Sequence, residues 1–145
     1  MAVKTTVSRA VEELDSKEIV EKVAKAITKN RSMEIRHDNT LFYIALKEAG
    51  LDAYEILREA SRKLIENTKK KAGEHPPIST ETIFTWLSSW REYVGKDEVE
   101  AKVAQRLLIL KGILEGRYWI SQIGQNLVVI SDGHSRFTIT KGSIH

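Results

Sequence analysis

The chain of 145 residues contains no cysteine, carries a net charge of +3, and is 41% hydrophobic and 30% charged. The lack of cysteine excludes disulfide bonds, thiolate metal sites and a cysteine nucleophile, and it favours a reducing compartment. The longest apolar run, at 107–110, is too short to cross a bilayer, and early acidic residues argue against a signal peptide. These properties predict one cytoplasmic domain over residues 1–145 with no membrane partner, and the abundant Lys, Glu and Arg would also suit a thermophile.

Helix signals dominate the first third of the chain. An apolar stripe over 7–14 predicts a short helix, and Asp15 with Glu18 forms a capping box for a longer helix through residue 30. Periodicity then breaks, and Asp38 or Asn39 can cap a helix that ends at Gly50. Two or three helices are therefore expected before residue 51.

Three more helices are predicted before residue 116. Asp52 and Glu55 fit a capping box for a helix that ends near three lysines at 69–71, where cations favour the negative end of the dipole. After the prolines at 76 and 77, a helix is expected over 79–94 and another over 97–115. The last one is apolar on nearly all sides, which is typical of a central, buried helix. The helical part thus spans 1–115.

Residues 116–141 form the only stretch whose pattern predicts a β-sheet. Gly124 and the Asp132–Gly133 pair are typical of tight hairpin turns, so a three-stranded antiparallel meander is expected. Pairing across these turns gives one strongly apolar face, made of Trp119, Ile123, Val128, Ile130, Phe137 and Ile139. This face is expected to pack on the helices, above all on the last one.

The opposite face of this meander mixes apolar and polar side chains. It carries Tyr118, Ile120, Leu127, Val129, Gln122, His134, Arg136, Thr138 and Thr140. Three interpretations follow. In the first, the chain itself covers this face. In the second, the face forms a protein–protein or self-association surface through Tyr118, Ile120, Leu127 and Val129. In the third, it binds nucleic acid, with Tyr118 stacking on a base and Arg117, Arg136 and Lys141 on phosphates.

Motifs for chemistry are lacking. No two histidines, and no histidine and carboxylate, share metal-ligand spacing on a helix face, and there is no glycine-rich phosphate loop or nucleophile elbow. We therefore predict no metal, no cofactor and no enzymatic activity. Arg36 lies just before a predicted helix start, where a phosphate contact is conceivable.

The last third of the chain, two helices followed by a β-ribbon, resembles a winged helix. That resemblance implies that Lys102 and Arg106 on the second helix and Arg136 on the ribbon meet DNA. The very short connection at Gly95–Lys96 and the apolar second helix depart from the winged-helix pattern.

The sequence as a whole predicts an α+β fold, with five or six helices in a bundle and a C-terminal three-stranded meander over 116–141. The favoured function is that of a non-catalytic accessory subunit that binds DNA or RNA within a larger nucleic-acid-handling assembly. The alternative is a module for protein–protein interaction or homo-oligomerisation. The predicted nucleic-acid contacts are Arg36, Arg106, Arg117, Tyr118, Arg136 and Lys141.

Overall fold

The structure is a computed structural model, and it describes residues 11–31 and 40–145. In chain order its elements are α2 (Lys17–Arg31), α3 (Leu41–Glu48), α4 (Ala53–Ala72), α5 (Thr80–Ser88), the 3₁₀-helix η2 (Lys96–Glu98), α6 (Val99–Leu114), β1 (Trp119–Gly124), β2 (Leu127–Ser131), β3 (Arg136–Thr140) and β4 (Ser143–Ile144). The α+β class is confirmed. The sheet has four antiparallel strands rather than three, because residues 143–144 add a strand beyond the predicted meander.

The ends of α4 follow the sequence signals. The Asp52 carboxylate accepts a hydrogen bond from the backbone amide of Glu55 at 3.3 Å, and Gly73 ends the helix in the left-handed conformation. At the start of α2 the cap is Ser16 rather than Asp15. The Ser16 hydroxyl accepts from the amide of Ile19 at 3.2 Å, while Asp15 forms an ion pair with Lys111. The predicted caps Asp38 and Asn39, and the start of the predicted helix over 7–14, lie outside the described residues.

The helix predicted over 79–94 ends at residue 88 instead, and 89–95 belong to no helix or strand. Two serine hydroxyls turn back onto the last turn of α5: Ser88 donates to the carbonyl of Phe84 and Ser89 to that of Thr85, each at 2.7 Å. Such local bonds compete with helical amides for the same acceptors. The carbonyls of Trp86, Leu87 and Ser89 accept hydrogen bonds from the side chain of Arg106 in α6, so they need no amides from a further helical turn.

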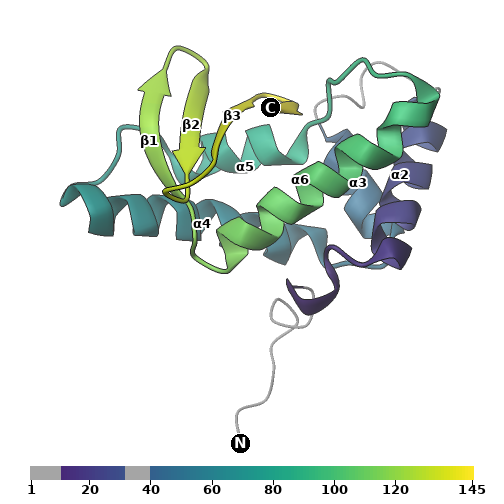
Figure 1. Cartoon of the computed structure of the whole chain (residues 1–145), viewed down its shortest axis with the longest axis horizontal. Coiled ribbons are helices and arrows are strands. Elements are labelled where there is room, and N and C mark those ends of the chain that lie inside the picture. Colours follow the sequence, from purple (N-terminus) through teal and green to yellow (C-terminus); the bar gives the residue numbers. More distant parts are fainter. Residues whose placement is uncertain (1–10, 32–39) are drawn as a thin grey trace, which may run out of the picture.

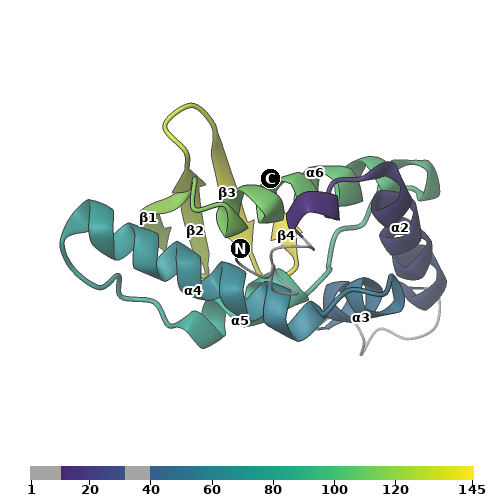
Figure 2. The ribbon, with the colours of Figure 1, turned by 90° about the horizontal axis from the view of Figure 1, so that it is seen from below.

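The sheet lies at one end of the molecule, with α2 and α3 at the other end (Figures 1 and 2). Strand order is β1-β2-β3-β4, with β1 in contact with α4 and β3 in contact with α5. Helix α6 contacts α2 and α4. The sheet therefore packs mainly on α4 and α5, and the prediction that it packs on the last helix is wrong. Buried apolar side chains from Leu14 to Ile144 still form one continuous core.

A β-bulge in β1 changes which side chains enter this core. Ile123 pairs with Val128 as the predicted face requires, but the register shifts at Ser121, so Ile120 pairs with Ile130 and Trp119 with Ser131. A one-residue shift sends every following side chain to the other face. Ile120 is therefore buried and Trp119 is not. Ile123 lies near the hairpin tip and is 37% exposed.

Gly112, in the interior of α6, makes room for a ring. A Cβ atom added to Gly112 would lie 2.3 Å from Cε2 of Tyr118, whose ring meets Phe137 edge-on at 6.1 Å between centroids. We expect Gly112→Ala to lower the free energy of unfolding by about 1–3 kcal/mol, since overpacking outweighs the gain in helix propensity. Urea unfolding measures the change.

The matched background for this substitution is Tyr118→Ala. Without the ring, Gly112→Ala should stabilise the protein by about 0.5–1 kcal/mol, because only the helix propensity of alanine remains. A destabilisation of equal size in both backgrounds would show that the Tyr118 ring is not what excludes a side chain at position 112.

Candidate nucleic-acid interface

Arg106 does not lie on the surface, and its predicted contact with phosphate is wrong. It is 2% exposed, and its guanidinium lies against the rings of Phe42 and Trp90, with its central carbon 4.4 Å from the centroid of Phe42 and 5.3 Å from that of Trp90. Burial lowers its pKa to about 10, partly opposed by Glu92, so it remains charged at neutral pH. The guanidinium donates, at 2.5–3.4 Å, to four backbone carbonyls: those of Trp86, Leu87, Ser89 and Gly142.

The winged-helix interpretation fails for the same reason. Helix α6 packs against α2 and α4 instead of presenting a free face to DNA. Lys102, the other cation placed on DNA by that resemblance, has its ammonium 3.7 Å from a carboxylate oxygen of Glu92.

Tyr118 and Ile120 are also removed from the predicted contact face. Tyr118 is 6% exposed, and burial raises the pKa of its phenol. Ile120 is buried, and its backbone amide donates to the hydroxyl of Thr68 at 2.8 Å. Neither side chain can stack on a base or contact a partner, which leaves only Leu127 and Val129, both half-buried, from the predicted protein interface.

The outer sheet face, defined here as the face turned away from the helices, keeps most of its predicted members and gains Trp119. Cross-strand partners lie on the same face. One row therefore joins Trp119, Ser131 and Arg136 across β1, β2 and β3, and the next row joins Gln122, Val129 and Thr138. Trp119 is half-buried and Arg136 is exposed. The bulge thus exchanges the predicted Tyr118 for the neighbouring tryptophan.

Positive charge borders this row on both sides. The ammonium of Lys71 lies 4.3 Å from the ring centroid of Trp119, and the neighbouring Lys69 and Lys70 are exposed in the last turn of α4. No ion pair joins Lys71 or Arg136 to a carboxylate within the described part of the chain. Arg117 is exposed but has a carboxylate oxygen of Glu115 at 3.1 Å.

Asp132 is the acidic residue next to this row. Its carboxylate accepts hydrogen bonds from the backbone amides of Ser135 at 2.7 Å and His134 at 2.8 Å, and these bonds hold its pKa below the usual value. The carboxylate is therefore engaged in the β2–β3 turn. The row consequently combines one aromatic ring with Lys71 on one side and Arg136 on the other.

Lys141 does not join this row. It lies in the β3–β4 turn, about 17 Å along β3 from Arg136 at 3.4 Å per residue. There it borders a groove formed by Tyr43, Tyr54 and Phe84, three rings from three different helices. In each helix the ring stands outside the row of fully buried apolar residues. This position is the only feature of the sequence that indicates the groove. Arg36 lies outside the described residues.

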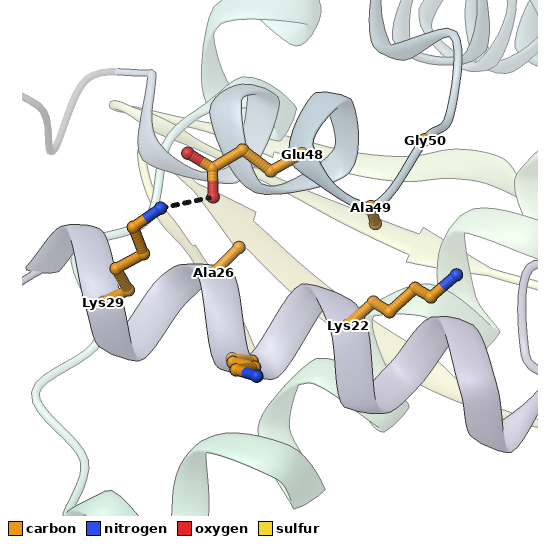
Figure 3. Close-up of a pocket in the computed structure, with 7 residues that line it drawn as sticks. Lys22, Ala26, Lys29, Glu48, Ala49 and Gly50 are labelled. Carbon is orange, nitrogen blue, oxygen red and sulfur yellow. Dashed lines mark ion pairs between the residues drawn. The ribbon is translucent and has the colours of Figure 1, made fainter.

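A separate hollow, of about 380 Å³, lies between α2 and the C-terminal end of α3 (Figure 3). Lys22 and Lys29 border it, and the ammonium of Lys29 is 3.9 Å from a carboxylate oxygen of Glu48. The negative end of the α3 dipole points into the same place. These lysines therefore complement charges of the protein itself.

Within residues 11–31 and 40–145, no cluster of three or more histidine and acidic side chains could hold a metal ion, and no helix is long and apolar enough to span a membrane. Comparison of the chain with family models, with curated proteins and with solved structures finds no match.

Proposed function

We propose that this protein binds single-stranded DNA or RNA on its outer sheet face, as a non-catalytic accessory subunit of a nucleic-acid-handling assembly. The observation that carries the proposal is the row formed by Trp119 and Arg136, with Lys71 over the tryptophan ring. An aromatic ring on a sheet, bordered by cations, is the arrangement on which unpaired bases stack while their phosphates are neutralised.

The contact between Lys71 and Trp119 is compatible with base stacking. A cation–π contact at an exposed site contributes about 0.5–1 kcal/mol, whereas a stacked base contributes about 1–3 kcal/mol. A base can therefore displace the ammonium from the ring. Because Lys71 lies in the last turn of α4, its flexible side chain can then turn to the phosphate of the same nucleotide.

The alternative function, a protein interface on the same face, loses its support because Tyr118 and Ile120 are buried. What remains of the apolar surface is Leu127, Val129 and Trp119, which is small for a stable interface. The cations bordering the row favour a polyanion instead.

Binding of oligo(dT) and oligo(U) by fluorescence anisotropy, at several salt concentrations, tests the proposal. Trp119→Ala should weaken binding by about 5- to 150-fold without changing the salt dependence, because it removes stacking only. Arg136→Ala should reduce the slope of log K against log salt by about 0.7, the value for one phosphate contact with a single strand.

Lys25→Ala is the matched control for Arg136→Ala, since Lys25 is an exposed cation on α2, remote from the sheet. It should leave affinity and slope almost unchanged. Equal affinities and slopes for wild type, Trp119→Ala and Arg136→Ala would rule out the outer sheet face as the binding surface.

A further inference from the structure

Three aromatic rings line a groove between α3, the first turn of α4, and α5. Phe84 is central, with its ring centroid 6.5 Å from that of Tyr43 and 5.8 Å from that of Tyr54, and both pairs are tilted. Tyr54 is 53% exposed, and the other two rings are half-buried. The rings thus line the surface, whereas Phe42 and Trp90 form the stacked aromatic pair in the core.

The groove consists of two hollows that share Tyr54, Phe84 and Thr85. The wider hollow measures about 530 Å³ and is also lined by Thr40, Tyr43, Ser88 and Lys141. The narrower hollow measures about 280 Å³ and is also lined by Arg58, Thr80 and Glu81. The wider hollow alone has the size of a small-molecule site, which typically measures a few hundred to about 1,000 Å³.

Charge distinguishes the two ends of the groove. No carboxylate lines the wider hollow, and Lys141 there forms no ion pair with any described residue. At the narrow end, the guanidinium of Arg58 is 2.9 Å from a carboxylate oxygen of Glu55, which raises the pKa of Arg58, and Glu81 adds a negative charge. An anionic group is therefore favoured only at the Lys141 end.

The turn that carries Lys141 is held in place from inside the protein. The carbonyl of the adjacent Gly142 accepts hydrogen bonds from the backbone amide of Arg91 at 2.9 Å and from the buried guanidinium of Arg106 at 3.3 Å. The base of the lysine side chain is thus fixed beside the rings. Fixing a cation near a stacking surface reduces the entropy lost when a ligand binds.

We propose that this groove binds a nucleobase that carries a phosphate, with the base against Tyr54 and Phe84 and the phosphate on Lys141. Thr40, Tyr43 and Ser88 also line the wider hollow and bring hydroxyl groups that suit the polar edge of a base or a sugar; the Ser88 hydroxyl donates to the carbonyl of Phe84 and can only accept from a ligand. This chemistry is shared by a free nucleotide and by an unpaired nucleotide of a strand. The site is separate from the outer sheet face and does not depend on it.

Binding of a free nucleotide in the groove is tested with AMP and adenosine by isothermal titration calorimetry on the full chain. AMP should bind more tightly than adenosine. Tyr54→Ala should weaken both by about 5- to 150-fold, because the stacking ring is lost. Lys141→Ala should weaken AMP alone, until its affinity equals that of adenosine. Tyr54 and Lys141 are exposed, so both variants should fold.

Binding of an unpaired nucleotide within a nucleic-acid strand is tested with oligo(dT) and oligo(U) and the same variants. If the groove takes an unpaired nucleotide of a strand, Tyr54→Ala and Lys141→Ala should weaken oligonucleotide binding even where AMP binds poorly. Tyr93→Ala is the matched control, since Tyr93 is 92% exposed and does not line the groove. Trp119→Ala should leave AMP binding unchanged, which separates this proposal from the outer sheet face. The inference is overturned if Tyr54→Ala and Lys141→Ala alter the binding of neither AMP nor an oligonucleotide.

Discussion

Replacing Arg106 with alanine should lower the free energy of unfolding by about 2–6 kcal/mol, a large fraction of the stability of a typical domain. The guanidinium is charged and buried, and its bonds to the carbonyls of Leu87 and Ser89, at 3.2 and 2.5 Å, are both lost; a hydrogen bond to a charged group is worth about 1.5–3 kcal/mol. The guanidinium also packs against the stacked rings of Phe42 and Trp90. Chemical denaturation in urea gives the change directly.

Arg106→Met separates hydrogen bonding from packing. Methionine fills much of the same space but donates no hydrogen bond, so the carbonyls of Leu87 and Ser89 still lose their bonds to the side chain. We expect this variant to be nearly as unstable as the alanine variant. If it were as stable as the wild type, the hydrogen bonds of the guanidinium would contribute nothing net, and packing alone would explain why Arg106 is buried.

Arg106→Lys keeps the charge but not the planar fork. An ammonium has three donors on one atom and cannot lay a flat face on a ring as a guanidinium does. The lysine variant should lie between the wild type and the alanine variant, and it provides a folded protein for measurement should Arg106→Ala not fold. The order of the variants thus tests whether the planar geometry of the guanidinium matters.

Local signals in the sequence predicted the helices well, because caps depend on nearby residues. Asp52, Glu55 and Gly73 define α4 without any distant contact. The early end of α5 could not be predicted in this way, since a side chain eighteen positions beyond the end of the helix binds the last carbonyls. An arginine on an apolar helix is predicted to be exposed, because the sequence does not reveal the buried carbonyls that accept its hydrogen bonds.

The candidate surface was predicted in part. Arg136 lies on the outer sheet face as expected, but the bulge at Ser121 places Trp119 on that face in place of Tyr118, and periodicity cannot locate a single extra residue in a strand. The aromatic groove was not predicted at all. Its rings come from positions 43, 54 and 84 and from three helices, so only the packing of α3, α4 and α5 brings them together.

Gly142→Ala should also destabilise the protein strongly, by about 2–5 kcal/mol. Gly142 has a φ of +88°, a conformation that costs other residues about 1–2 kcal/mol. A Cβ atom would also lie 2.7 Å from the backbone nitrogen of Arg91, so the turn has to move away. Its carbonyl would then lose its bonds to Arg91 and Arg106, each worth about 0.5–1.5 kcal/mol.

Gly116→Ala is the matched control for this prediction, because Gly116 has a φ of +77° but no atom within 4 Å of an added Cβ. It should show the conformational cost alone, about 1–2 kcal/mol. Equal losses of unfolding free energy at both positions would mean that the contact with Arg91 is unimportant. In the Arg106→Ala background the cost of Gly142→Ala should shrink, because one of the bonds it breaks is already absent. Strict additivity of the two substitutions would therefore contradict a shared role of the Gly142 carbonyl in joining α6 to the β3–β4 turn.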